Sequence, residues 1–185
     1  RTQRSHSLEF AACLLFLLCL RVLNASGQDW TGLSPQEAAQ ERRVTLKGTV
    51  LCYDQAWGQL YLHDGSETHY LNPLWFTNQF EIGQKVEIHA VTKWDGTSPA
   101  LTNATVQVQG KEALPQPIRI KMSELAKHYG QWVEISGWVR LAESSQGRLA
   151  LLLKDGPQTS TVYVMQTTER SPFRYLQDAW VSVRG

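Results

Sequence analysis

The sequence has few of the residues from which disulfides, metal sites and phosphate-binding loops are built. Its 185 residues include 3 cysteines, and it contains no paired-cysteine metal motif, no HExxH pattern and no glycine-rich phosphate loop. No nucleophile stands with a base in a recognisable catalytic set either. We therefore expect no metal, no cofactor and no enzyme activity in this stretch of chain, and we leave open whether a longer protein has one.

An excess of basic charge is also missing. The 18 lysines and arginines face 17 aspartates and glutamates, and from Gln28 onward the counts are 15 and 16. A protein that holds nucleic-acid phosphates usually carries a basic stripe, because phosphate contacts supply most of its non-specific affinity. The sequence shows no such stripe, so a nucleic-acid partner is not expected.

Only one long apolar run is present, the eleven residues Phe10–Leu20, which follow Arg1 and Arg4. As a helix this run would span only about 16 Å, roughly half of a bilayer's hydrocarbon core. Small residues suited to cleavage follow at 25–27. We predict that residues 1–27 are a signal peptide or, if uncleaved, an N-terminal anchor. Its removal leaves Cys52 as the one cysteine, which we expect to be a small buried hydrophobe.

The main positive feature is an internal repeat. The segment Val44–Val50 returns as Val133–Val139, 89 positions later. Two further segments of the first copy, 58–65 and 82–88, have looser counterparts at 148–156 and 176–183. Two copies of one β unit predict two domains.

Each copy is predicted to be a small β unit. Polar and apolar residues alternate from Val44 to Tyr53, which is typical of a half-buried strand, and Gly48 within it marks a bend or bulge. Asp64-Gly65 is a hairpin signal. The first copy is predicted to hold five strands, at about 44–53, 59–63, 67–71, 85–91 and 101–108. Five short strands with a bent first strand favour an all-β fold of tandem, partly open OB-like barrels, with two SH3-like barrels as the alternative.

These segments predict a domain map. Residues 28–43 form a short helical lead-in with Ser34 as N-cap, and 44–109 form the first OB-like barrel. Residues 110–131 are a linker whose helix is capped by Ser123 and ended by Gly130. The second OB-like barrel, 132–185, is incomplete, because it breaks off where strand four ends. We therefore expect the chain to be a fragment of a longer protein.

The candidate binding residues are aromatic. Tyr61 alternates in phase with the apolar Leu60 and Leu62, so it should point outward, on the strand 2–3 face that OB barrels use for ligands. The interpretation that we favour over binding is that these rings only fill gaps between the two barrels and the linker helix. The candidates are Tyr53, Trp57, Tyr61, Tyr70 and Trp75.

The nearest approach to a metal cluster is His63, Asp64, Glu67 and His69, around the first hairpin. We interpret these residues as a polar turn with two strand histidines, since the histidines do not recur in the second copy.

Several of these segments together resemble a known family. The sequence VTLKGTVLCYDQAWGQLYLHDG, then IGQKVEIHAV, a Ser-capped helix and HYGQWVEISGWVR, is similar to the extracytoplasmic N-terminal region of many bacterial two-component sensor histidine kinases. The resemblance covers Arg43 to Gly185. It implies OB-like β units after a signal or anchor, followed by a membrane segment and a cytoplasmic kinase. The phospho-accepting and ATP-binding parts of the kinase are not within these residues.

The sequence thus leads us to expect a periplasmic sensory or ligand-binding module of such a signal-transduction protein. Its ligand would be a small molecule or a protein or peptide, met at the strand 2–3 face or between the barrels, and a segment beyond residue 185 would join it to the membrane. A homodimer is compatible with this reading. Three alternatives stay open: a free-standing exported OB-fold binding protein, a single-stranded nucleic-acid-binding OB protein, and an exported hydrolase.

Overall fold

The computed structural model describes residues 30–145, 148–165 and 173–185. The predicted signal peptide or anchor, residues 1–27, lies outside these ranges. Among the residues described, no helix is both long enough and apolar enough to cross a membrane.

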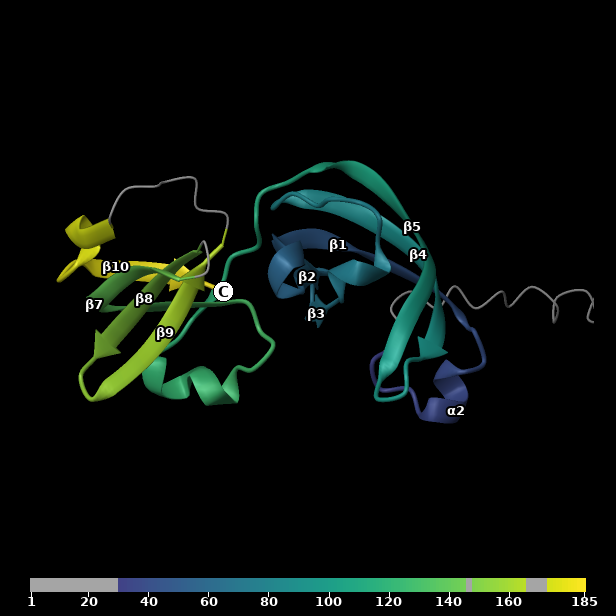
Figure 1. Ribbon diagram of the computed structural model, residues 1–185, viewed down its shortest axis with the longest axis horizontal. Helices are drawn as coiled ribbons and strands as arrows, with labels where there is room; N and C mark the ends of the chain where they lie inside the picture. Colours follow the sequence, from purple (N-terminus) through teal and green to yellow (C-terminus); the bar gives the residue numbers. More distant parts are fainter. Residues whose placement is uncertain (1–29, 146–147, 166–172) are drawn as a thin grey trace, which may run out of the picture.

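The described chain is almost entirely β, so the predicted all-β class is confirmed. Figure 1 shows two lobes side by side, joined by the segment between β5 and β6. The first lobe contains α2 (Pro35–Ala38), β1 (Arg43–Asp54), η1 (Gln55–Trp57), β2 (Gln59–His63), β3 (Thr68–Tyr70), η2 (Pro73–Trp75), β4 (Gln84–Trp94) and β5 (Pro99–Lys111). The second contains β6 (Ile118–Arg119), η3 (Met122–Lys127), β7 (Val133–Ser145), β8 (Arg148–Asp155), β9 (Gln158–Val164), η4 (Phe173–Leu176) and β10 (Trp180–Arg184).

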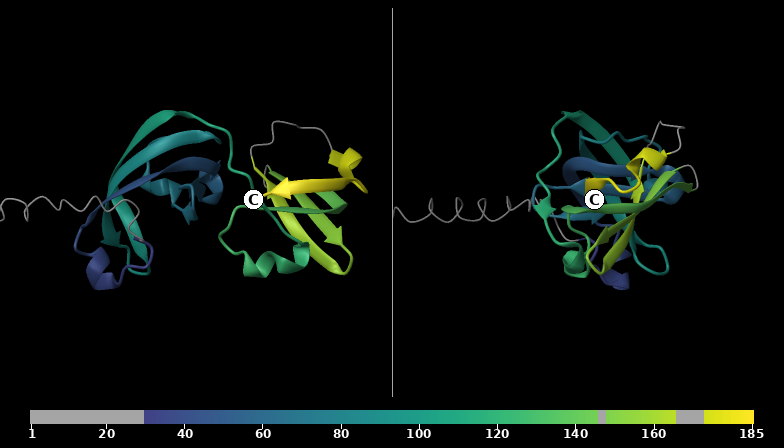
Figure 2. Two further views of the ribbon diagram at one scale, coloured as in Figure 1. Left: turned by 180° about the vertical axis from the view of Figure 1, so that it is seen from behind. Right: turned by 90° about the vertical axis from the view of Figure 1, so that its left-hand side faces the viewer.

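The two sheets share one strand order. The first runs β3-β2-β1-β4-β5, and the second runs β9-β8-β7-β10, with β6 added in parallel to β7. Counterparts of β1 to β4 therefore recur in the second lobe in the same spatial order. Within the described residues β3 and β5 stay at opposite edges of the first sheet, and neither sheet closes into a barrel. Seen from behind in Figure 2, the end of the chain after β10 lies where the two lobes meet.

The first strand of each lobe is long because it serves two partners. In β1, residues 43–49 pair with β4 and residues 49–54 pair with β2, with a bulge between Val50 and Cys52. The bulge recurs in β7 between Val139 and Leu141, 89 positions later. A bulge adds one residue to its strand, so the alternation of faces reverses beyond it.

That reversal corrects two predictions. Cys52, expected among the buried residues of β1, is only half-buried and pairs with Tyr61 on the outer face. Tyr53, expected to point outward, is buried in the core with its ring against Phe80, 5.4 Å between centroids. The period-2 alternation of β1 holds only up to this bulge, and the residue types around Val50 and Cys52 do not predict its position.

Gly48 sits two residues before the bulge, so it is a site of close approach and not the bulge itself. A Cβ at this position would lie 2.4 Å from the carbonyl oxygen of His63 in β2, which no side chain tolerates. The equivalent Gly137 has more room, because its Cβ would lie 3.1 Å from both the Lys154 carbonyl oxygen and the tip of Met122. The glycine recurs because the neighbouring strand crosses tightly at this point in both lobes.

Each lobe has its own hydrophobic core. The first is the larger and includes the fully buried Val50, Leu60 and Val86. The second is built around Val139 and Leu153 and is completed by Met122 from η3. A small core of this kind needs covering from outside its sheet, which explains why η3 packs beneath β7 and β9.

The predicted cap is confirmed for the first of the two predicted helices and is wrong for the second. Ser34 caps α2 as expected, in a capping box with Glu37, although the helix ends at Ala38. The second segment is a 3₁₀ helix that begins one residue before Ser123, so Ser123 is not its cap. The backbone N–H of Lys121 instead donates to the Glu124 carboxylate, 3.1 Å, which lets Met122 enter the core.

Candidate functional site

A groove runs along the outer face of the first sheet to the place where the lobes meet, and we call it the junction groove. The first lobe contributes the β2–β3 hairpin to its wall, and the second lobe contributes residues 129–132, between η3 and β7, and the ends of β9 and β10. Tyrosines come from both lobes: Tyr61, Tyr70, Tyr129 and Tyr163. The groove therefore depends on segments far apart in the sequence.

Tyr61 is placed by the alternation of β2. Its neighbours Leu60 and Leu62 are buried in the core, so Tyr61 points to the opposite, groove-facing side, as predicted. Its ring packs against Tyr70, 5.6 Å between centroids, and the Tyr70 hydroxyl donates to the Gly58 carbonyl oxygen at 2.9 Å. Partial burial, together with Tyr129, Cys52 and Tyr70 nearby, raises the pKa of the Tyr61 phenol. Tyr61 is therefore a neutral hydrogen-bonding group at physiological pH.

Trp75 also lines the groove, while part of its ring packs on the first core. It meets Trp30 edge to face, with 5.8 Å between ring centroids. Trp30 is buried, and its indole Nε1–H has no hydrogen-bond partner among the residues described. A buried donor left unpaired is costly, so Trp30 contributes to the core at this end of the groove through its ring and not through its N–H.

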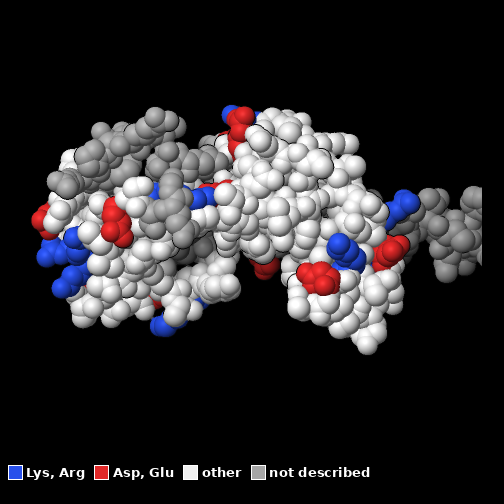
Figure 3. Space-filling view, in the orientation of Figure 1, with Lys and Arg blue, Asp and Glu red and all other residues white. Residues whose placement is uncertain are grey.

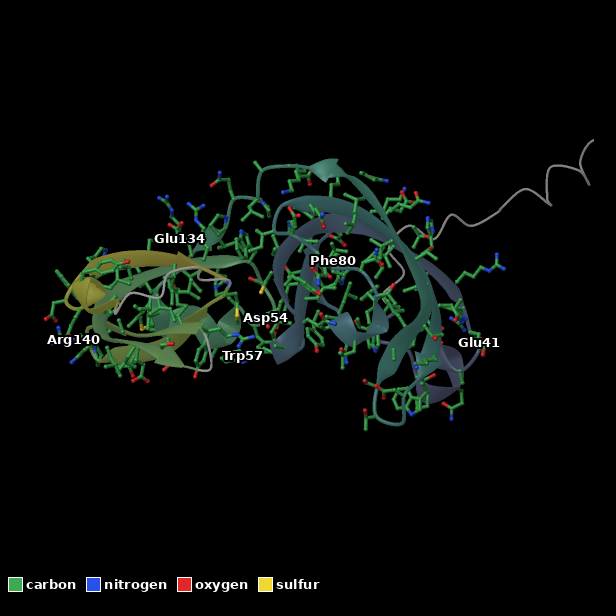
Figure 4. The ribbon with its side chains drawn as sticks, turned by 45° about the horizontal axis from the view of Figure 1, so that its top comes forward. Glu41, Asp54, Trp57, Phe80, Glu134 and Arg140 are labelled. Carbon is green, nitrogen blue, oxygen red and sulfur yellow. The ribbon has the colours of Figure 1, made fainter. Side chains whose placement is uncertain are left out.

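Trp57 has a different role, because it lies between the lobes. Its ring meets Tyr163 of β9 edge to face at 4.8 Å, and the Arg148 guanidinium lies over it at 4.3 Å from the centroid. Arg148 also pairs with Asp54, with 2.6 Å from Nε to Oδ2. Figure 4 shows Asp54 and Trp57 at the boundary between the two lobes.

The Asp54 carboxylate performs two tasks at once. It accepts the Trp57 backbone N–H at 3.1 Å, which holds the turn that presents the Trp57 ring, and it accepts from Arg148. The Arg148 hydrogen bonds hold the pKa of Asp54 below its ordinary value, although burial opposes them. The turn in the first lobe and the ion pair to the second are thus built on one side chain.

The histidine-containing hairpin is organised by Asp64. This carboxylate accepts the backbone N–H groups of Ser66 and Glu67 and the Nε2 of His69, each at 2.8 Å. Burial alone would raise the pKa of Asp64, but these hydrogen bonds outweigh it and leave the pKa well below its usual range. The described residues hold no group of three or more His, Cys, Asp or Glu side chains placed to bind a metal ion.

Farther along the same outer face lies a polar patch centred on Glu87. Its carboxylate pairs with Lys47 at 3.1 Å, with Gln109 at 2.7 Å and with His89 at 3.3 Å. The hydrogen bond from Lys47 contributes most to lowering the pKa of Glu87. Acidic and basic side chains are thus paired with each other in this patch. Figure 3 shows scattered charges on the visible face without a continuous basic stripe.

The predicted site residues therefore separate into three groups. Tyr61, Tyr70 and Trp75 line the junction groove, Trp57 lies in the contact between lobes, and Tyr53 is in the core. Sequence reasoning missed Tyr129 and Tyr163, which come from the linker and the second copy. Neither carries a local signal that would distinguish it from any other exposed tyrosine.

The arrangement offers ring faces, phenolic hydroxyls and amide groups, and its charged groups are mostly paired with one another. Such a surface suits the binding of a ligand with little net charge. No family model matches this chain, and no curated protein matches it at a significant level.

Proposed function

We propose that the chain is an extracytoplasmic ligand-binding module that serves a sensory role. The observation that carries this proposal is the convergence of Tyr61, Tyr70, Tyr129 and Tyr163 from both lobes on one groove. Aromatic rings that only filled gaps would be buried, but Tyr70 is 46% exposed and Tyr129 is 96% exposed. Exposed rings gathered in a groove favour recognition over packing.

We further propose that each lobe is an OB-type unit. The long first strand that pairs with β4 over one half and with β2 over the other supports this assignment. So does the position of the groove, because OB folds bind ligands on the strand 2–3 face and its flanking loops. The repeated bulge and glycine give the second lobe the same curved first strand.

The sensory role would work through the contact between lobes. A ligand in the junction groove touches Tyr163, whose ring also packs on Trp57, so binding would change how the lobes meet. Gly185 also lines the groove, and it exchanges backbone hydrogen bonds with Val133 at 2.8 and 3.0 Å. A change at the junction would thereby be passed to the segment that follows. In a two-component sensor histidine kinase of the bacterial cytoplasmic membrane, that segment leads to the membrane and the kinase.

A thermal-shift screen tests the binding function. Sugars, small metabolites and short peptides are added to the purified chain and to its Tyr61→Ser variant, with Val108→Ser on exposed β5 as the matched control. A ligand at about a hundred times its dissociation constant adds about 2.7 kcal/mol, which raises Tm by roughly 5–10 °C for a chain of this size. We expect such a shift in the wild type and the control but not in Tyr61→Ser. Ligands that stabilise all three proteins equally would contradict the proposal.

The kinase context has a separate test. The gene downstream of Gly185 should encode a membrane-spanning helix followed by a kinase domain. A stop codon soon after would instead support the free-standing exported binding protein, which would use the same groove.

A further inference from the structure

We propose that the junction groove recognises an extended polypeptide segment, which pairs as an added strand with the free edge of β3. The inference rests on the proposed binding function and names the ligand class of the same site.

Two sheet edges border the groove. β3 is the last strand of the first sheet and β9 is the last strand of the second. Residues 68–70 of β3 and 162–164 of β9 both belong to the groove wall. An edge strand presents backbone N–H and C=O groups that no neighbouring strand uses. A ligand in this groove therefore meets main-chain donors and acceptors as well as side chains.

The register of the hairpin identifies which groups are free. Leu71 N–H donates to the Leu60 carbonyl oxygen at 2.9 Å, and Asp64 N–H donates to the Glu67 carbonyl oxygen at 3.1 Å. Since bonded and non-bonded pairs alternate in an antiparallel ladder, the backbone groups of Thr68 and Tyr70 point away from β2. Neither residue has a backbone partner on that side among the residues described.

The side chains beside this edge suit a peptide. Tyr70 is 46% exposed, Tyr129 is 96% exposed and Tyr163 is 43% exposed, and all three line the groove. Tyrosine supplies a large amphipathic contact surface at a low cost in conformational entropy. Successive residues of an added strand face opposite sides, so every second side chain of the bound segment would meet these rings.

Charge limits what the segment can be. The hairpin carries Asp64 and Glu67, but Asp64 already accepts four hydrogen bonds within its own hairpin. The remaining charged groups of the groove are of both signs. We infer that recognition depends on the backbone and on apolar or aromatic side chains at alternate positions, in a segment of small net charge.

The test uses blocked hexapeptides that carry Tyr, Trp, Leu, Ile or Val at alternate positions and Ser, Thr or Gln between them. Their affinities for the purified chain are measured by fluorescence polarisation, and the tightest binders are remade with backbone N-methyl groups on either the odd or the even residues. Pairing with β3 uses every second N–H of the peptide, so one pattern should weaken binding by about tenfold or more and the other should change it little. Equal effects of the two patterns would overturn the proposal, as would a library without any binder.

Substitutions on the protein side give an independent readout. Thr68→Pro removes one of the outward-facing N–H groups without touching the backbone bonds to β2, whereas Thr68→Val keeps that N–H. Both substitutions remove the 3.5 Å contact between the Thr68 hydroxyl and His63 Nδ1, so the comparison between them isolates the N–H. We expect Thr68→Pro to weaken peptide binding about tenfold and Thr68→Val to leave it unchanged, with similar Tm values. If Thr68→Pro fails to fold, the N-methyl comparison decides. Peptides that bind Thr68→Pro as tightly as wild type would contradict strand pairing.

The N-methyl comparison and the Tyr61→Ser variant together distinguish a failure of the peptide assignment from a failure of the proposed binding function. Tyr61-dependent binding of sugars or small molecules, without any dependence on the N-methyl pattern, would overturn the peptide assignment and leave the binding module standing. The absence of any Tyr61-dependent ligand would overturn both.

Discussion

Arg148 and Asp54, 94 residues apart in the sequence, form an ion pair that joins the two lobes, and each side chain is only 11% exposed. The guanidinium also covers the Trp57 ring, so charge pairing and stacking act on the same side chain. The pair joins the lobes beside the Trp57–Tyr163 contact, and Tyr163 also lines the junction groove.

Removing the arginine should therefore destabilise the protein. We expect Arg148→Ala to lower the free energy of unfolding by about 1–3 kcal/mol, because Asp54 is left without its partner in a largely buried position. The matched control is Arg140→Ala, whose partner Asp178 is 69% exposed, and which should cost less than about 0.5 kcal/mol. Urea denaturation of the three proteins measures both changes. Similar losses in the two variants would show that the contact between lobes contributes no more than a surface pair.

The Asp54 pair should also respond to pH. Folding lowers the pKa of this carboxyl, so its stabilisation is complete above the unfolded value of about 3.9 and is lost as the pH falls through the lower folded pKa. The difference in stability between the wild type and Asp54→Asn should shrink as the pH falls from 7 to 2. Asp64 and Asp95 titrate in both proteins and cancel in this comparison. A difference that stays constant with pH would contradict the assignment.

The two repeated glycines should not tolerate substitution equally. Gly48→Ala forces a Cβ against the His63 carbonyl oxygen at 2.4 Å, so it should cost at least about 2 kcal/mol. Gly137→Ala places its Cβ 3.1 Å from the flexible tip of Met122 and from the Lys154 carbonyl oxygen, and should cost less than about 1.5 kcal/mol. Thermal unfolding of the two variants compares them directly. Equal losses would mean that the backbone around Gly48 relaxes to admit a methyl group.

Single-stranded nucleic acid should not bind the groove. The lysines and arginines along it are interspersed with carboxylates, and Lys47 is paired with Glu87. A fluorescent oligothymidine titrated at low salt should therefore show no salt-dependent binding up to about 10⁻⁴ M. Tight binding that weakens as salt is raised would instead favour the nucleic-acid-binding alternative.

Local sequence signals predicted the strands well. Alternation located β2 at residues 59–63, and turn residues such as Asp64-Gly65 and the cap at Ser34 are where the structure has them. These features depend on a few adjacent residues, so a single sequence contains the information that determines them.

The misplaced residues depend on longer-range geometry. Tyr53 and Cys52 lie on the opposite faces of β1 from those predicted, because of the bulge in β1. That bulge arises in the pairing with β2, and no residue type in β1 predicts it. Arg148 and Tyr163 meet the first lobe only because the two sheets dock against each other, across about a hundred residues of chain. The groove is built at this docking contact, so alternation within one copy identified Tyr61 but not the tyrosines opposite it.

The most direct test of the account maps where a ligand binds. Two-dimensional ¹H–¹⁵N NMR spectra of the labelled chain, recorded during titration with a ligand found in the thermal-shift screen, report on each backbone amide separately. We expect the amides of Tyr61, Tyr70, Tyr129 and Tyr163 to shift together, with a smaller change at Trp57 as the contact between lobes adjusts. Shifts confined to one lobe, for example to the exposed Trp138 and Trp180 on the second sheet, would contradict it.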